Sequence, residues 1–414
     1  MVFTKIIQDE AFQLTYMRYD ESEYTTQLQE KTLQMKNDLS LSSNLEVETF
    51  TSPSKYFRNR VKFGMVGGNE EDSNGVEVSY RYVMWEYGAP TVEVRSFPIA
   101  CYLINQAMYH LREYFNSYIE VTDPLSQVKS VNFLSTTTKQ TLVITLIYEK
   151  KLDETGWLRQ GEKLRGYLVD TLGITGISII AKARKQKVTI GTGCVIEKFE
   201  LRNGRQVIYK QVEDGFSNPN GHVNRHSLNW LCSVVGEIDF QLTSALSSSE
   251  IQHDHQHYDL LELYCGNGNH TVAMSAFAKR VVAVELNKSL CETAVENLKL
   301  NAIDNVKIVH CDSAKFCNKI LREKKFVDKD DKGSNIDYNF STVLVDPPRA
   351  GLDDNTRALV AGFRDIIYIS CNPVALKRDL TELLKEHEIK KFAVFDHFAY
   401  THHLECGCYL SKWK

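Results

Sequence analysis

The C-terminal half of the chain alternates between short apolar runs and segments with helical periodicity. The apolar runs predict strands at Asp259–Leu263, Val281–Leu286, Val306–Cys311, Thr342–Val345, Ile366–Cys371, Phe392–Phe395 and Cys408–Ser411. Helical segments separate most of these runs, and strands that are joined through helices pair in parallel. The pattern therefore predicts an α/β fold with a doubly wound, mostly parallel, Rossmann-like sheet, whose ligands bind beyond the carboxyl ends of the strands.

Two polar motifs stand where neighbouring strands of this sheet are expected to end. Asp346-Pro347-Pro348-Arg349 follows one apolar run, and Ser370-Cys371-Asn372-Pro373 ends the next one along the chain. Because parallel strands end at the same edge of a sheet, a carboxylate and a thiol are expected to share one crevice.

A glycine-containing turn, Gly266-Asn267-Gly268, follows the first of the predicted strands. It lacks the third glycine of a dinucleotide-binding motif, so it suits a nucleoside ligand without a pyrophosphate. Glu285 closes the second strand and can accept the ribose hydroxyls, whereas Asp312 after the third can reach a base amino group. With Asn269 and Asp346 beside the reactive end, the set predicts a site for S-adenosylmethionine.

A thiol and a carboxylate beside a methyl donor indicate a particular reaction. Carbon 5 of uracil becomes nucleophilic only after a thiolate adds to carbon 6, and a base must then remove the carbon-5 proton. Cys371 precedes an expected helix start, which lowers a thiol pKa, and Glu405 precedes the last strand. The alternative is that Cys371 is a small buried core residue, the usual fate of a lone cysteine.

Asp346-Pro347-Pro348 also occurs in a similar form in amino-group methyltransferases, which place an aromatic residue next. Here Arg349 stands in that position, which disfavours an exocyclic nitrogen as the methyl acceptor. The guanidinium is instead available for a carbonyl or a phosphate.

The N-terminal half predicts an α+β domain. A helix is expected from Asp20, with Tyr24, Leu28 and Met35 on one face, and a strand near Val47–Phe50. Further elements are expected as a helix at 98–117, with Pro98 in its first turn, a hairpin from Val131–Phe133 and Thr141–Tyr148, a helix at 154–171, strands at 175–183 and 187–191, and a helix at 222–236.

Two basic segments lie in this half. At a period of two residues, Arg58, Arg60 and Lys62 share one face of an expected strand, and Phe57, Val61 and Phe63 share the other. Aligned cations repel one another, which favours an anionic partner such as phosphate over a solvated outer face. Lys182–Lys187 is expected at a hairpin tip. For this second segment an anionic partner and a solvated outer face both stay open as interpretations.

Bulk properties limit the alternatives. The chain is 43% hydrophobic and 25% charged, with a net charge of −4, so a nucleic acid must be held by local patches. The ten cysteines are scattered and form no Cys-x-x-Cys pair, which favours free thiols and predicts neither a zinc nor an iron–sulfur site. Three histidines near Asp254 are interpreted as part of a surface linker, 247–257, rather than as metal ligands.

No apolar run approaches the ~20 residues of a membrane span, and no secretory signal is seen. Cytoplasmic residence is expected, with the nucleus or an organelle as alternatives.

At these residues the sequence resembles the RNA uridine-C5 methyltransferase family, and within it the bacterial-type tRNA (uracil-5-)-methyltransferases that form ribothymidine at uridine-54 of the T-loop. The resemblance runs from about Tyr24 to the end. Its most specific segments are Asp346–Gly351, Ser370–Pro373 and Tyr400–Cys406.

The resemblance implies that Tyr264, Asn269, Glu285 and Asp346 bind S-adenosylmethionine, that Cys371 is the nucleophile and that Glu405 is the base. Asn218 stands where the family has a glutamine that contacts the cofactor, one methylene shorter. Arg58, Arg60, Lys62 and Arg349 are the expected RNA contacts.

The resulting prediction divides the chain into an RNA-recognition domain, 1–205, and a methyltransferase domain, 206–414, acting on tRNA. The sequence does not determine the oligomeric state, for which a monomer is the default. Ribosomal-RNA members of the family carry an N-terminal barrel and a four-cysteine cluster motif, and neither is seen here. Alternatives are the same chemistry on ribosomal RNA, or an RNA-binding or chaperone protein that has lost activity. Amino-methylation of DNA or protein is disfavoured by Arg349 and leaves the thiol without a role.

Overall fold

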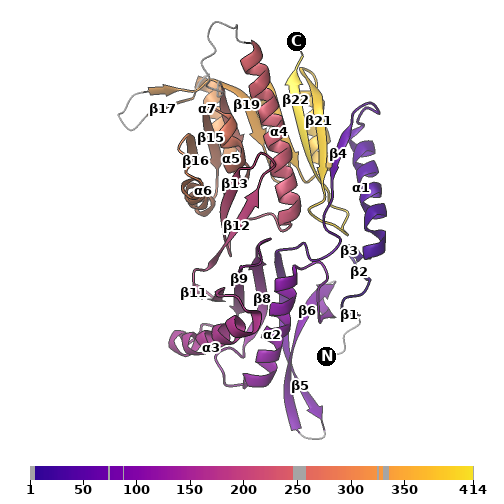
Figure 1. Ribbon diagram of the computed structural model, residues 1–414, viewed down its shortest axis with the longest axis vertical. Coiled ribbons are helices and arrows are strands. Elements are labelled where there is room, and N and C mark those ends of the chain that lie inside the picture. The colour runs from indigo at the N-terminus through magenta and orange to yellow at the C-terminus, as the bar shows by residue number, and fades with distance from the viewer. Residues whose placement is uncertain are drawn as a thin grey trace.

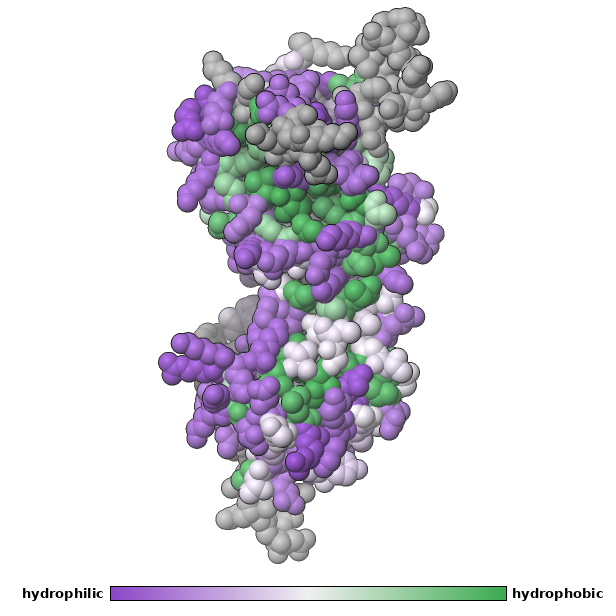
Figure 2. Space-filling view, turned by 90° about the vertical axis from the view of Figure 1, so that its left-hand side faces the viewer, coloured by the Kyte–Doolittle hydropathy of each residue, from purple (hydrophilic) through white to green (hydrophobic). Residues whose placement is uncertain are grey.

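The computed structural model describes residues 5–72, 75–86, 88–245, 258–323, 326–329 and 335–413. It consists of two bodies, each built around an eight-stranded sheet (Figure 1). The surface narrows between the two bodies (Figure 2). The expected linker with its three histidines lies outside the described residues.

The first sheet belongs to the α+β body. Its strand order is β1 (Lys5–Ile7), β7 (Ala89–Val94), β6 (Gly75–Glu86), β5 (Arg60–Asp72), β8 (Val128–Ser135), β9 (Thr141–Tyr148), β10 (Gly176–Ala183) and β11 (Gln186–Ile190). Helices α2 (Tyr102–Tyr118) and α3 (Glu154–Leu172) pack on each other and on this sheet. The two predicted hairpins are confirmed. The expected start of the helix at 98–117 was wrong, because Cys101 takes the N-cap position and Pro98 precedes the helix.

The second sheet confirms the predicted doubly wound fold. Its order is β16 (Val306–His310), β15 (Arg280–Glu285), β14 (Asp259–Leu263), β19 (Phe340–Val345), β20 (Asp365–Ser370), β22 (Glu405–Lys412), β21 (His387–Phe395) and β4 (Val47–Phe50). Neighbouring strands pair in parallel except for β22, which is antiparallel to both β20 and β21. The helices are α4 (Gly221–Ala245), α5 (Asn269–Met274), α6 (Lys288–Leu300), α7 (Ser313–Glu323), α8 (Asp354–Val360) and α9 (Pro373–Leu383).

Successive residues of the central strands face opposite helical layers. Leu260 and Ile367 join the buried cluster that contains Trp230 of α4. Their neighbours Leu261 and Ile366 belong to a different cluster, which includes side chains of α7, α8 and α9. A strand that is apolar on both faces has to be covered by helices on both sides of the sheet. The continuous apolar runs in the sequence therefore explain the two helical layers.

Part of the N-terminal segment belongs to the second sheet. Strand β4 pairs in parallel with β21, and α1 (Tyr24–Leu39) packs against α9 beside it (Figure 1). The predicted division at 205 falls in the turn of a two-stranded ribbon, β12 (Cys194–Glu200) and β13 (Gln206–Val212), that lies between the bodies. The division stays a prediction, but residues 24–50 are built into the methyltransferase-like body. Shorter pairs are β2 (Phe12–Leu14) with β3 (Met17–Tyr19) and β17 (Val327–Lys329) with β18 (Asn335–Asp337).

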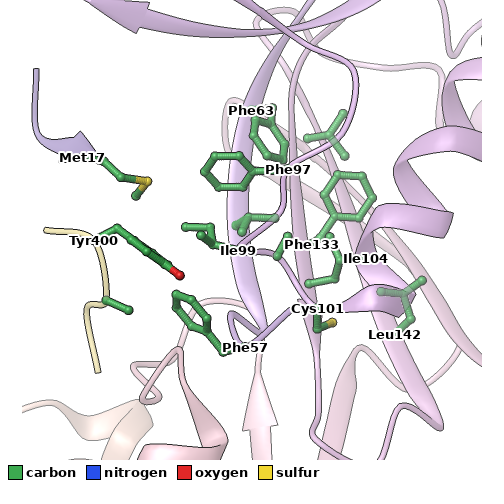
Figure 3. Close-up of a cluster of buried hydrophobic side chains, with 14 of the residues drawn as sticks. Met17, Phe57, Phe63, Phe97, Ile99, Cys101, Ile104, Phe133, Leu142 and Tyr400 are labelled. Carbon is green, nitrogen blue, oxygen red and sulfur yellow. The ribbon is translucent and has the colours of Figure 1, made fainter. Parts of the chain in front are cut away.

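Aromatic packing joins the bodies next to this segment. Tyr400, from the C-terminal segment before β22, lies beside Phe57 with ring centroids 6.4 Å apart and points towards the core of the first body (Figure 3). Its hydroxyl donates to the carbonyl of Ser54 at 2.5 Å. Both rings are part of one buried cluster that extends into each sheet, so the relative position of the bodies is fixed by core packing.

A nearly buried ion pair attaches α1 to the same C-terminal segment. The Lys31 ammonium lies 2.5 Å from Oδ1 of Asp396, whose side chain is fully buried. The same ammonium also donates to the carbonyls of Phe398 and His403. Burial lowers the pKa of Lys31, and the charge of Asp396 acts against that shift.

Replacing Lys31→Met is expected to destabilise the fold by about 3 kcal/mol, because it leaves the Asp396 carboxylate buried without its cation. Urea unfolding at pH 7 measures this change. Lys36→Met, in the last turn of the same helix, is the control and should change stability by less than about 0.5 kcal/mol. Equal unfolding free energies for Lys31→Met and Lys36→Met would contradict a stabilising role of the Lys31–Asp396 ion pair.

Candidate active site

The predicted residues gather at one edge of the second sheet. Tyr264, Asp346 and Cys371 each follow the last residue of a parallel strand, and Glu285 ends another. Because these strands run in the same direction, their carboxyl ends form a row. The expected shared crevice of a carboxylate and a thiol is consistent with this arrangement.

Glu405 reaches the same edge from the opposite direction. It is the first residue of the antiparallel strand β22, in which Cys406 pairs with Ser370 of β20. One residue further along this pairing, Glu405, which precedes Cys406, lies beside Cys371, which follows Ser370. The charge of Glu405 raises the pKa of that thiol.

Cys371 lies in the turn between β20 and α9 and is partly buried. Asn372 caps the helix by accepting from the Val374 amide at 3.1 Å, and its Nδ2 donates to the Arg349 carbonyl at 2.7 Å. That bond ties the two polar motifs together.

The backbone at the helix start acts to lower the Cys371 pKa, as expected, but the net shift of that pKa is upward. Burial raises the pKa of the thiol, the carboxyls of Glu405 and Asp346 raise it further, and only Arg349 and the backbone act in the other direction. Desolvation and two acidic neighbours thus outweigh the backbone amides of the helix start.

Of the two carboxyl groups at this edge, Glu405 is buried and Asp346 is partly exposed. Burial raises the pKa of Asp346, and burial together with the Asp346 charge raises the pKa of Glu405. Like charges in a low-dielectric site disfavour double ionisation, so the pair holds a proton at neutral pH.

Two buried histidines stand behind these carboxyls. His397 Nε2 is 3.7 Å from Oε1 of Glu405, and His270 Nδ1 is 3.9 Å from Oδ2 of Asp346. Burial lowers the pKa of His270 to about 4 and that of His397 to about 3, so both rings are neutral at pH 7. Sequence reasoning missed both; the available signal was a histidine directly after Asn269 and another beside Asp396.

The glycine turn presents its backbone to a ligand. Gly266 and Gly268 have φ angles of 57° and 80°, the left-handed region that favours glycine. Glu285 accepts from the Gly266 amide at 3.0 Å and from the Asn287 amide at 2.6 Å, which fixes its carboxylate beside the turn. A Cβ on Gly266 would meet no atom within 4 Å, so this side of the turn is open and fits a nucleoside ligand.

A chain of amides lies beside that turn. Asn218 Nδ2 donates to Oδ1 of Asn224 at 2.9 Å, and Asn224 and Asn269 exchange hydrogen bonds of 2.9 Å. Asn218 is thereby linked to Asn269 in spite of its shorter side chain. Sequence reasoning missed Asn224, which nothing in its sequence context distinguished from other helix residues.

The remaining cofactor candidates occupy the neighbouring strand ends. Tyr264 has a φ of 65°, a strained value for a residue other than glycine, and burial raises its pKa to about 12. Asp312 follows β16 and accepts from the Lys315 amide at 3.0 Å, in the first turn of α7. A base contact by Asp312 stays a prediction.

A cavity of about 590 Å³ opens between Cys371 and helix α1. Arg349 lines it and is exposed, with Nη2 3.4 Å from Nε2 of His403. The other lining residues are Asn372, Pro373, His402, His403, Leu404 and, from α1, Glu30, Lys31, Gln34, Met35 and Asp38. The cavity can hold a nucleotide with its base next to the thiol.

The predicted RNA-binding run lies apart from this cavity, in the first body. The alternation is confirmed, since Phe57, Val61 and Phe63 are buried while Lys62 is exposed, although the regular strand begins only at Arg60. Arg60 donates to the carbonyls of Val212 and Glu213 and to Ser217, and Arg58 Nε donates to the Arg60 carbonyl. These two guanidiniums are thus partly engaged within the protein, and their RNA contact stays a prediction.

Among the described residues, no group of three or more His, Cys, Asp or Glu side chains is arranged to hold a metal ion. Across the same ranges, no helix has the length and apolar character needed to cross a membrane.

A family model described as tRNA (Uracil-5-)-methyltransferase matches residues 23–413. The chain belongs to this family. Relatives include the tRNA/tmRNA (uracil-C(5))-methyltransferases of Proteus mirabilis and Cellvibrio japonicus, each 36% identical, over 94% and 95% of this chain and 97% of each relative. A crystal structure of the Pyrococcus abyssi tRNA (uracil-54, C5)-methyltransferase with S-adenosyl-L-homocysteine superposes with a TM-score of 0.63 at 19% identity, over 94% of this chain and 83% of that one, which supports the fold.

As a member of the tRNA (uracil-5-)-methyltransferase family, the protein is an S-adenosylmethionine-dependent enzyme that methylates uracil in tRNA. The resemblance seen in the sequence is confirmed at the level of the family.

A further buried acid belongs to the strand that precedes the glycine turn. Glu262 of β14 is fully buried; its Oε2 accepts from the Thr271 hydroxyl at 2.5 Å, and Oε1 has no hydrogen-bond partner among the described residues. Burial raises its pKa to about 8 from an ordinary 4.5. Between these values the folded protein holds a proton that the unfolded chain has lost, so stability falls as pH rises.

Glu262→Gln is expected to remove this dependence. Between pH 5 and pH 8, wild type should lose roughly 3 kcal/mol of unfolding free energy relative to the variant. Urea unfolding at the two pH values measures the difference, and Glu292→Gln on the exposed side of α6 is the control. Parallel pH profiles for wild type and Glu262→Gln would contradict burial of a protonated acid.

Proposed function

We propose that this enzyme methylates carbon 5 of uridine-54 in the T-loop of tRNA, through covalent addition of Cys371 and proton removal by Glu405. The observation that carries the proposal is the register of β22, which brings a carboxyl beside the thiol at the edge where Asp346 also lies. A thiol and a general base beside a methyl donor are the groups that this reaction needs.

The glycine turn and its neighbours are suited to hold S-adenosylmethionine. Glu285, fixed by the Gly266 amide, would bind the ribose hydroxyls, and Tyr264 would contact the nucleoside beside it. Asn269 and Asp346 would bind the amino-acid end, with Asn218 supporting Asn269 through Asn224. When bound, the cofactor supplies an electrophilic methyl group on a sulfonium.

Each step of the reaction has a residue suited to it. The Cys371 thiolate adds to carbon 6 of uracil, forming a C–S bond and moving an electron pair to the enolate at carbons 4 and 5. Carbon 5 then takes the methyl group and still carries its hydrogen. Glu405 removes that proton, the carbon 5–carbon 6 double bond re-forms and the thiolate leaves.

The protonation states constrain when these steps occur. Burial and the two carboxyls raise the pKa of Cys371, and burial raises that of Glu405. Both reactive forms are anions that are disfavoured next to each other. Arg349, which lowers the thiol pKa, would therefore also help to form the nucleophile, in addition to holding a carbonyl or phosphate of the substrate.

The target base has to leave its stack to reach the thiol. The cavity beside Cys371 has the size for a nucleotide, and Arg349, His402 and His403 at its wall supply polar contacts. The first body would hold the rest of the RNA, with exposed Lys62 and, in part, Arg58 and Arg60 directed at the backbone.

The first experiment uses an unmodified tRNA transcript and methyl-labelled S-adenosylmethionine, followed by digestion and location of the label. Label in 5-methyluridine of the T-loop is the expected result. Label elsewhere in tRNA, or only in a ribosomal RNA fragment, would overturn the T-loop assignment. A tmRNA transcript is a further arm, because the relatives are named for both RNAs.

Two substitutions separate the chemical roles. Cys371→Ala is expected to abolish methyl transfer by at least about 1,000-fold while RNA and cofactor still bind, because no adduct can form. The Glu405→Gln variant is expected to methylate the base but not to remove the carbon-5 proton, so the bond between Cys371 and the base remains. A covalent protein–RNA adduct that survives denaturing gel electrophoresis should therefore accumulate.

Cys194→Ser, at a partly exposed thiol of β12, is the matched control and should turn over normally. An active Cys371→Ala variant, or a Glu405→Gln variant that turns over at the wild-type rate, would contradict the mechanism.

A further inference from the structure

A buried histidine that none of the reaction steps uses lies beside the proposed base. His397 is 1% exposed, and its Nε2 lies 3.7 Å from Oε1 of Glu405. Strand β21 ends at Phe395, which pairs with Glu405, and the His397 amide donates to the Phe395 carbonyl at 2.9 Å. The turn that follows the strand therefore holds the ring next to the carboxyl.

Both nitrogens of the His397 ring are buried. Neither forms a hydrogen bond with any residue that the structure describes. A buried polar group without a partner destabilises a fold, whereas an apolar side chain of similar size does not. Because these nitrogens are closed off from the surface, a partner in another state of the site has to come from the protein itself. The Glu405 carboxyl is the group that lies within a short movement of Nε2.

The protonation state of Glu405 changes during the proposed reaction, and the ring can respond to that change. Burial and the charge of Asp346 raise the pKa of Glu405, so both oppose the carboxylate that has to take the carbon-5 proton. A carboxylate only accepts hydrogen bonds, whereas a neutral imidazole offers one N–H. A hydrogen bond from Nε2–H to Glu405 therefore favours the form of the base that the reaction needs.

The distance between the two groups is slightly longer than a hydrogen bond. An ordinary N–H···O bond is about 2.9 Å long, so an approach of less than about 1 Å is enough to form it. Catalytic hydrogen bonds are often long before the substrate binds and shorten in the reacting complex. The separation in the free protein is therefore compatible with a bond that forms during catalysis.

The ring acts as a donor and not as a second base. Burial, together with nearby His270, lowers the pKa of His397 to about 3, so the ring does not take the proton from Glu405 at pH 7. The nearby backbone of Asn220 acts to raise that pKa, as an acceptor does. The neutral ring has a single N–H to give, and a charged acceptor forms the stronger hydrogen bond, so the Glu405 carboxylate prevails over the neutral backbone.

We propose that His397 is a positioning residue for Glu405: its Nε2–H donates to the Glu405 carboxylate and directs that group at the carbon-5 proton of the methylated adduct. The proton moves from carbon 5 to Glu405, the electron pair of the C–H bond re-forms the double bond, the thiolate leaves, and His397 keeps its own proton. The proposal rests on the proposed function, in which Glu405 is the base. It concerns proton removal alone and leaves thiolate addition and methyl transfer unchanged.

The test is His397→Leu, which fills a similar space and removes both nitrogens. Enzyme in excess over an unmodified tRNA transcript is mixed with methyl-labelled S-adenosylmethionine and sampled over time on a denaturing gel. Label that migrates with the protein measures the adduct, and label in free RNA measures its release. The adduct should form at the wild-type rate, and release should slow about tenfold to a hundredfold, the loss of one hydrogen bond to a charged group.

His397→Gln is the second variant and keeps an N–H donor in its side-chain amide. Release should therefore return to within about threefold of the wild-type rate. A ring that only filled space would give the reverse order, because a buried leucine would then be tolerated better than a buried amide.

His226→Leu is the matched control. His226, in α4, is partly buried, and its Nδ1 also lacks a partner among the described residues. The charges that act on its pKa are those of Arg225 and Arg202 rather than of a carboxylate. Adduct formation and release should both match those of wild type.

Release at the wild-type rate in His397→Leu would overturn the proposal. Release that is as slow in His397→Gln as in His397→Leu would also overturn it, as would adduct formation slowed to the same extent as release. A failure of the proposed function is read separately from Glu405→Gln, which would then accumulate no adduct. An adduct in Glu405→Gln together with normal release by His397→Leu would overturn this inference alone.

Discussion

The position of Glu405 depends on the direction of one strand. The strands of a parallel sheet all end at the same edge, and a residue that follows one of these strands lies at that edge. Strand β22 runs the other way, so it begins where β20 ends, and its first residue lies beside Cys371. A parallel strand at this place would put Glu405 at the far end of the sheet. The antiparallel insertion is therefore the constraint on which the thiol–carboxylate pair depends.

Burial at that edge determines the electrostatics of the site. Asp346 and Glu405 have raised pKa values, and the neighbouring His270 and His397 have lowered ones, for the same reason: charge is expensive away from water. The surroundings are thus held largely neutral, although they contain several ionisable groups.

Some of the side chains that hold the fold together also line its cavities. Lys31 pairs with Asp396 and at the same time lines the cavity beside Cys371. Arg60 donates to the carbonyls of Val212 and Glu213, where the ribbon between the bodies ends. Because Arg60 is also a proposed RNA contact, we expect RNA binding to be sensitive to the relative position of the bodies.

The sequence by itself determined the C-terminal sheet, because apolar runs separated by helices have few other ways to bury both faces, and strand-end residues such as Asp346 and Cys371 then fall at one edge. It also determined the family, through motifs that are local in sequence. Only the tertiary structure decided that β4 joins the second sheet, that Arg58 and Arg60 are partly used inside the protein, and that the Cys371 pKa is raised. These outcomes depend on which distant groups come close, and burial and neighbouring charge are not properties of a local segment.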